Sequence, residues 1–215
     1  LWEAQRLLGN FLNADPYQLF LCANVTDAMN TFILGAPLPS SGEILVSNFE
    51  YPAVSKTCKK RAEDLGLQYR EFTLFEDPQS FVETTEDQLL EIILNELRPD
   101  TRMLMLSHIV TMNGTILPIE RIGEETRKRG ILFAVDGAHA PGGISLDFQQ
   151  LHSVDYYGGN LHKWVMGPKG TAFGWIHPDR IEALKPLRYG WTTDEIPAQF
   201  HGFAEGKPHT SKFLL

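Results

Sequence analysis

The chain has 215 residues, of which 43% are hydrophobic, enough to bury a sizeable core in one domain without disulfide bonds. Nineteen Lys and Arg against 27 Asp and Glu give a net charge of −8, which disfavours a nucleic-acid or anionic-membrane partner because both select a basic face. Cys22 and Cys58 match no metal-ligand spacing, no apolar run approaches the ~18 residues of a membrane span, and the first residues do not form a signal peptide, so we expect a cytoplasmic protein.

Short apolar runs alternate with helical patterns along the chain. The apolar runs predict strands at 19–25, 43–48, 67–74, 103–109, 131–137, 154–160 and 170–176. Helical spacing of apolar residues, with N-cap residues and a glycine stop, predicts helices at 26–34, 52–66, 85–97, 118–130 and 177–185. This alternation is typical of an α/β domain with a parallel or mostly parallel sheet covered by helices.

The two ends of the sequence suggest how far the domain extends. It lacks an initial Met and ends on the apolar run 213–215, so we expect a piece of a longer protein. The predicted domain covers residues 1–197, and residues 198–215 are expected to lead away from it.

Polar side chains follow five of the predicted strands, at the point where each strand ends. Because ligands gather at the carboxyl ends of the strands in such sheets, we expect the five loops to border one crevice. The loops are 24–26, 47–51, 107–113, 136–139 and 160–163.

Two of these loops carry a lysine and an aspartate in apolar surroundings. Lys163 lies in GGNLHKWVMGPK and Asp136 ends the run ILFAVD; a buried ammonium is costly unless it is paired, neutralised or used covalently. The two groups could form a simple ion pair. They are also the pair that pyridoxal phosphate (PLP) uses, with the lysine as Schiff base and the aspartate at the pyridine nitrogen. The helix that starts near Val25 and Thr26 offers N–H and hydroxyl donors for a phosphate.

The segments VDGAHAPG (135–142) and GGNLHKWVMGPKGTAFGW (158–175) resemble the class V aminotransferase family of PLP enzymes. Within the family, the sequence is most similar to the isopenicillin N epimerase-like branch and more distantly similar to cysteine desulfurases. The resemblance extends through ANVTDAMN, SNFEYPAV and SHIVTMNGTILPI. It implies the large domain of PLP-dependent transferase fold type I, with a mostly parallel seven-stranded sheet, in a homodimer whose small domain would lie beyond this chain.

The resemblance assigns roles around the cofactor ring. Lys163 would form the Schiff base and move protons at the substrate α-carbon, while Asp136 would pair with the pyridinium nitrogen. His139 would lie beside the phenolic oxygen of the ring, and Thr111 takes the place of an asparagine that contacts this oxygen in desulfurases. Tyr51 would stack on the ring face, although an ordinary half-buried tyrosine fits the sequence equally well.

The resemblance also assigns phosphate contacts. Val25, Thr26, Asn160 and His162 would reach the phosphate of PLP, although Thr26 could equally be a helix N-cap. His108 precedes the ring-contacting loop and would line the same wall. The alternative for His108 is a core histidine with a satisfied hydrogen bond.

The implied function is an enzyme that acts at the α-carbon of an amino acid, a lyase or an epimerase. A cysteine desulfurase-type sulfur transferase is an alternative, but Cys22 in a strand and Cys58 in mid-helix do not look like reactive loop thiols. The segment EGKPHTS (205–211) departs from the family pattern, because Lys207 stands where a threonine reaches the partner subunit's phosphate.

Two further alternatives stay open on the sequence. One is a non-catalytic fragment with the PLP-enzyme fold. The other is a metal-dependent hydrolase that uses Asp136, His139 and His162, although their spacing matches no HExxH-type motif. The segment 167–174 lacks the spacing of a phosphate-binding P-loop, so we read it as a turn into a strand.

Overall fold

The computed structural model describes residues 2–76, 84–189 and 209–213. The strands are β1 (Leu19–Cys22), β2 (Glu43–Ser47), β3 (Gln68–Phe72), β4 (Thr101–Ser107), β5 (Leu132–Gly137), β6 (Tyr156–Asn160) and β7 (Ala172–Ile176). The helices are α1 (Trp2–Leu12), α2 (Val25–Gly35), α3 (Pro52–Leu65), α4 (Glu86–Glu96), α5 (Ile119–Lys128) and α6 (Pro178–Ile181), with 3-10 turns η1 (Pro16–Gln18) and η3 (Thr210–Phe213). Each strand and helix predicted from the sequence is present, with shifted ends.

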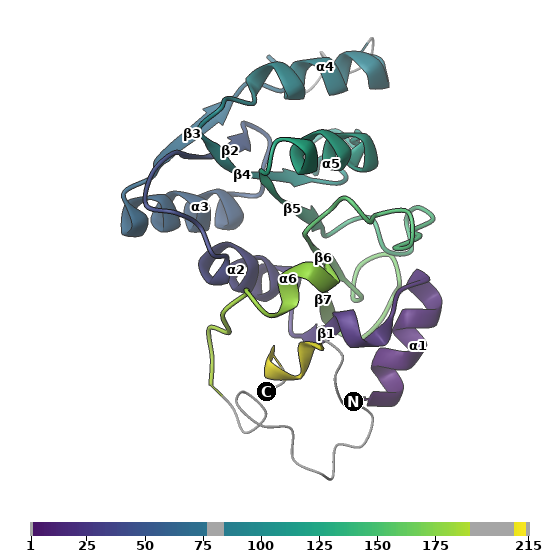
Figure 1. The fold of residues 1–215 in the computed structure, drawn as a ribbon. Helices are drawn as coiled ribbons and strands as arrows, with labels where there is room; N and C mark the ends of the chain where they lie inside the picture. Colours follow the sequence, from purple (N-terminus) through teal and green to yellow (C-terminus); the bar gives the residue numbers. More distant parts are fainter. Residues whose placement is uncertain (1, 77–83, 190–208, 214–215) are drawn as a thin grey trace.

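All seven strands form one sheet in the order β1-β7-β6-β5-β4-β2-β3 (Figure 1). β6, β5, β4, β2 and β3 pair in parallel, and β7 runs antiparallel to both of its neighbours, β1 and β6. Helices α2, α3 and α6 contribute to one buried cluster, and α1, α4 and α5 to the other. The α/β fold with a mostly parallel, seven-stranded sheet is therefore confirmed.

The start of α2 differs from the sequence-based expectation. We expected a strand through Val25 and a cap at Thr26 or Asp27, but β1 ends at Cys22 and Asn24 is the N-cap. The Asn24 side-chain oxygen accepts the Asp27 N–H at 2.9 Å, which satisfies one of the free N–H groups of the first turn. Val25 and Thr26 therefore lie inside the first turn of a helix.

Glycines in β6 place the start of α2 against the end of the sheet. A Cβ on Gly158 would lie 2.9 Å from Val25 Cγ2 and 3.2 Å from Met29 Sδ, so any larger residue would push the helix away. In the same register, Asp136 of β5 stands opposite Gly158 on one side and Ser107 of β4 on the other. The ends of three neighbouring strands and the N-terminus of α2 thus meet at one place.

Two segments at the ends of the described chain were not predicted. α1 packs its Leu8 and Leu12 into the core, and its buried Gln5 donates to the Leu19 carbonyl at 2.5 Å. In η3, Thr210 donates to the same carbonyl, and the Phe213 ring lies 5.3 Å from that of Phe20. Both segments cover the β1 edge of the sheet.

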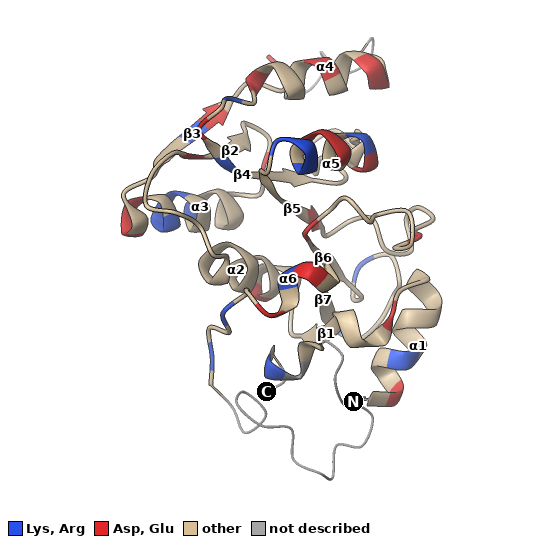
Figure 2. Ribbon diagram, in the orientation of Figure 1, with Lys and Arg blue, Asp and Glu red and all other residues tan. Residues whose placement is uncertain are grey.

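Most charged residues that the structure describes lie on the helices. Figure 2 shows Lys, Arg, Asp and Glu on α1, α3, α4, α5 and α6, and also on the edge strand β3. Within the described ranges, no helix is both long and apolar enough to cross a lipid bilayer.

Candidate active site

A cavity of about 550 Å³ opens at the carboxyl ends of the strands, and we call it the strand-end cavity. It is bordered by loops that follow β1, β2, β4, β5 and β6, as the sequence predicts. Its lining residues are Asn24, Val25, Thr26, Asp27, Tyr51, Ala53, Thr111, Asp136, Ala138, His139, Asn160, His162 and Lys163. The structure therefore brings together nine of the ten residues that the sequence analysis placed at the site, and His108 is the exception.

Lys163 contacts a histidine whose protonation is fixed by a third side chain. Lys163 Nζ lies 3.0 Å from His139 Nε2, and the Trp164 indole N–H donates to His139 Nδ1 at 3.3 Å. An indole N–H only donates, so Nδ1 must accept and the proton of a neutral His139 lies on Nε2. That N–H needs an acceptor, which the lysine offers only as a free amine. Burial lowers the pKa of Lys163, in the direction of the free amine, and burial also lowers the pKa of His139, which a charge on Lys163 would lower further.

Asp136 is a buried carboxylate with a single hydrogen-bond partner among the described residues. Its Oδ1 accepts the Ala138 N–H at 2.9 Å, and 3% of the residue is exposed. Burial raises the pKa of Asp136 to about 6, against the opposing effects of the Ala138 N–H and the Lys163 charge. Asp136 and Lys163 border the same cavity, where each charge favours the ionised form of the other. Asp136 Oδ1 accepts the Ala138 N–H and Lys163 Nζ lies against His139, so the simple ion-pair interpretation has no direct contact to support it.

The α2 end of the cavity offers donors for an anion, but fewer than the sequence suggested. The Val25 N–H already donates to Asn160 Oδ1 at 2.9 Å, which leaves the Asn160 amide nitrogen and Thr26 at the helix N-terminus. His162 Nδ1 lies 2.9 Å from the Thr171 carbonyl, which can only accept. His162 Nε2 can therefore donate only when the ring is protonated.

Tyr51 and Thr111 border the cavity from the loops that follow the neighbouring strands β2 and β4. Tyr51 is the N-cap residue of α3, directly before Pro52, and half of it is exposed. Its ring is available for stacking on a flat ligand. Thr111 is exposed and lies between this cavity and a neighbouring one.

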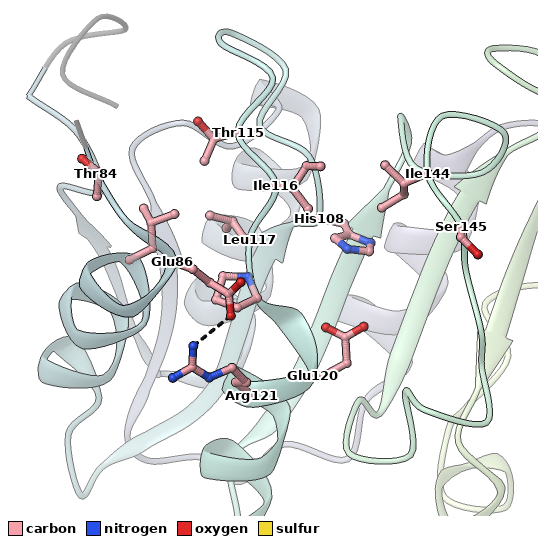
Figure 3. Close-up of a pocket in the computed structure, with 12 residues that line it drawn as sticks. Thr84, Glu86, His108, Thr115, Ile116, Leu117, Glu120, Arg121, Ile144 and Ser145 are labelled. Atoms are coloured by element: carbon pink, nitrogen blue, oxygen red, sulfur yellow. Dashed lines mark hydrogen bonds and ion pairs between the residues drawn. The ribbon is translucent and has the colours of Figure 1, made fainter. Parts of the chain in front are cut away.

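His108 does not line the strand-end cavity, contrary to the expectation from the sequence. Its Nδ1 bonds the Tyr157 hydroxyl at 2.9 Å, and burial lowers the pKa of His108 to about 4. The ring borders a different cavity of about 540 Å³, which we call the helix-side cavity, where Figure 3 shows it near Glu120 and the Glu86–Arg121 ion pair. The interpretation as a core histidine with a satisfied hydrogen bond is correct.

The sequence analysis missed Glu50, a buried carboxyl directly before Tyr51. Ser47 Oγ and Ser107 Oγ each donate to it at 2.6 Å, so it joins the ends of β2 and β4 and holds the loop that carries Tyr51. Burial raises the pKa of Glu50 to about 7, and the Asp136 charge acts in the same direction. A carboxylate between two aromatic residues, directly after a strand with an apolar centre, was the available signal.

We expect Glu50 to make the fold less stable as the pH rises. Its pKa is about 7 in the folded chain against an ordinary 4.5, so its contribution is fully present below pH ~4.5 and is lost as the pH rises through ~7. In urea denaturation at pH 5 to 8, the free energy of unfolding should fall with pH, and Glu50→Gln should reduce that slope. Burial also raises the pKa of Asp136 in the folded chain, so Glu50→Gln should still lose some stability as the pH rises. Equal slopes in both proteins would contradict this assignment.

The two cysteines are both free thiols in apolar surroundings. Cys22 donates to the Asn24 carbonyl at 3.3 Å, and burial raises its pKa to about 12. Cys58 is fully buried, and burial raises its thiol pKa as well. Neither is a ready thiolate.

Other interpretations of the site residues can be compared with the same geometry. Across residues 2–76, 84–189 and 209–213, no three His, Cys, Asp or Glu side chains are arranged to hold a metal ion. His139 instead contacts Lys163 and Trp164 through its two nitrogens. The expected departure at Lys207 lies outside the described residues.

Comparison with known proteins places this chain in a family. The model of the aminotransferase class-V family matches residues 1–210. Isopenicillin N epimerase from Streptomyces clavuligerus is 38% identical over 191 residues, which cover 89% of this chain and 46% of that protein. Cysteine desulfurase IscS from Pseudomonas aeruginosa is 34% identical over 173 residues, covering 78% and 40% of the two chains.

A solved structure shares the fold. The cystine C–S lyase C-DES, in complex with its reaction product cysteine persulfide, has a TM-score of 0.83 at 28% sequence identity, covering 97% of this chain and 54% of that one. The chain thus spans about half the length of the proteins it matches. Since the family model covers nearly every residue, the chain belongs to the aminotransferase class-V family.

Proposed function

We propose that this chain is the PLP-binding large domain of an enzyme that acts at the α-carbon of an amino acid. The observation that carries the proposal is the Lys163 amine, held by His139 Nε2 in an arrangement that requires the free base, in one cavity with the buried Asp136. A solved C-DES variant with glycine covalently linked to its PLP cofactor supports the same cofactor here.

The donors and acceptors of the strand-end cavity fit PLP. Asp136 keeps an oxygen free of described partners, which suits a protonated pyridine nitrogen, and the free amine of Lys163 suits the aldehyde carbon. Thr26, the Asn160 amide and a protonated His162 would hold the phosphate at the N-terminus of α2. PLP, when bound, supplies an electron sink that stabilises negative charge at the substrate α-carbon.

The residues of the chain would position the substrate and move its protons. As a free base, Lys163 would remove a proton from the α-carbon of the substrate and return it. His139 and Trp164 would restrict the position of the Lys163 amine. The half-exposed Tyr51 ring would cover one face of the site and exclude water.

We favour a lyase or an epimerase among the reactions that start from such a site. The epimerase relative and the C–S lyase structure support these two. A cysteine desulfurase-type sulfur transferase is the second candidate, supported by the IscS relatives. Its nucleophile would lie outside the described residues, because burial keeps Cys22 and Cys58 protonated.

We also propose that the protein is a cytoplasmic homodimer with residues 1–197 as its large domain. The free Cys22 and Cys58 are consistent with a reducing compartment. The exposed Trp164 and Met166 beside the cavity are consistent with a covered surface in the assembly. Residues 198–215 would lead to the dimer interface and the small domain.

Borohydride reduction tests the proposal directly. The protein purified with PLP should be yellow, and reduction should remove the visible band and leave a pyridoxyl group on the Lys163 peptide in mass spectrometry. A colourless protein with stoichiometric metal would support the hydrolase alternative. A colourless, metal-free protein would support a non-catalytic module.

A further inference from the structure

A second, smaller cavity adjoins the strand-end cavity and has a different chemical character. It measures about 400 Å³, and we call it the apolar cavity. Its lining residues are Ile109, Val110, Thr111, Gly114, His139, Gly143 and Trp164. Thr111 and His139 belong to both cavities, and His139 is the single ionisable side chain of the smaller one.

The apolar cavity lies one imidazole ring away from the Lys163 amine. His139 bonds Lys163 at 3.0 Å through Nε2 and Trp164 at 3.3 Å through Nδ1, so the ring stands between the lysine and the indole wall. A substrate whose α-carbon is within reach of Lys163 lies beside His139. Its side chain can then extend past that ring onto Ile109, which is half-buried and therefore presents surface to the cavity, with the fully buried Val110 behind it.

The wall formed by Trp164 is held in place by its main chain. Gly142 has φ +80°, and a Cβ there would lie 2.7 Å from the Trp164 carbonyl carbon. A Cβ on Gly143 would lie 2.8 Å from the His139 carbonyl oxygen and 3.5 Å from Trp164 Cδ1, so this position also has no room for a side chain. This packing fixes the Trp164 backbone, and the bond to His139 orients its indole, although 58% of the residue is exposed.

We propose that the apolar cavity receives the substrate side chain and selects amino acids with an uncharged, apolar side chain of several carbon atoms. This inference rests on the proposed function and adds the substrate class to it. The cavity is of a size that holds part of a small ligand. A carboxylate or ammonium entering it would lose hydration without meeting an opposite charge.

Titration of the PLP-loaded protein with a homologous series tests the proposal. L-Alanine, L-2-aminobutyrate, L-norvaline and L-norleucine are added, and Kd is read from the change in the visible spectrum. Each added methylene should lower Kd about fourfold, the effect of burying one CH₂ group. L-Aspartate and L-lysine should bind more weakly than L-norvaline.

Two tryptophan substitutions in one loop provide a matched pair. Ile109 and Ile116 face each other in an isolated β-bridge, but Ile109 lines the apolar cavity and Ile116 lines the helix-side cavity. Ile109→Trp should fill the apolar cavity and reduce the gain per methylene to less than twofold. Ile116→Trp adds the same bulk elsewhere and should retain the fourfold gain.

The outcomes separate this inference from the function on which it rests. If wild-type protein shows no visible band and no borohydride adduct, the proposed function fails. If the band and adduct are present but Kd does not depend on chain length, or Ile109→Trp leaves the dependence unchanged, only the side-chain site is wrong. Tighter binding of L-aspartate or L-lysine than of L-norvaline would also overturn it.

Discussion

Lys163→Ala should abolish the visible band of the PLP-loaded protein and its borohydride adduct. The lysine supplies the single amine that the strand-end cavity presents beside Asp136 among the described residues. Its role in proton transfer predicts a further loss in turnover of about 10²- to 10⁴-fold. The fold should survive, because Lys163 is only partly buried and Asp136 keeps its hydrogen bond from the Ala138 N–H. Absorbance, mass spectrometry, steady-state kinetics and the urea midpoint measure the four effects.

Two further lysine substitutions make the result specific. Lys163→Arg keeps a long cationic side chain, but a guanidinium does not give up its proton and so cannot form the covalent bond. It should therefore lose the band as completely as alanine does. Lys169→Ala removes an exposed lysine six residues along the same segment and should leave the band intact. An adduct that persists in Lys163→Ala would place the covalent site elsewhere.

The sequence predicts this site well because two simple regularities meet in it. Apolar runs such as ILFAV identify buried strands, and a parallel sheet brings the residues after each run to one edge. Asp136 and Lys163 could therefore be placed together although 27 positions separate them in the chain. The family resemblance then added the phosphate and ring contacts.

The errors arise where one residue decides the local geometry. His108 follows Ser107 directly, and successive side chains along an extended segment point to opposite faces. Ser107 thus reaches Glu50, while His108 turns to Tyr157 and the helix-side cavity. The prediction assigned whole loops to the cavity, so it could not distinguish Ser107 from His108 within one loop.

Capping and buried polar pairs are the other source of error. Asn24 rather than Thr26 ends the extended segment, since its side chain reaches the Asp27 N–H. The side-chain oxygen of Asn160 accepts the Val25 N–H, a contact that the sequence did not indicate and that leaves only the Asn160 amide nitrogen for the expected phosphate. Both contacts depend on how close α2 comes to β6, which the pattern of apolar residues does not specify.

Asp136→Asn should separate a catalytic role from a structural one. Asparagine has nearly the same shape, and its side-chain oxygen can still accept the Ala138 N–H, so the site should keep its geometry and the band should still form. Turnover should fall about 10²- to 10⁴-fold, since breaking a buried charge pair costs about 3–5 kcal/mol. Steady-state kinetics on the amino acid that the protein is found to convert measure the loss. Unchanged turnover would contradict the pairing of Asp136 with a pyridinium nitrogen.

The same substitution should change stability in the opposite direction. Burial raises the pKa of Asp136 to about 6 from an ordinary 3.8, so the ionised carboxylate favours the unfolded chain once the pH exceeds ~6. Without PLP, Asp136→Asn should therefore be as stable as the wild type or more stable at pH 8, by urea denaturation. If the Asp136 carboxylate instead stabilised the fold, Asp136→Asn would lose both stability and turnover. A slower but more stable variant would thus show that the cofactor, and not the fold, needs the charge at this position.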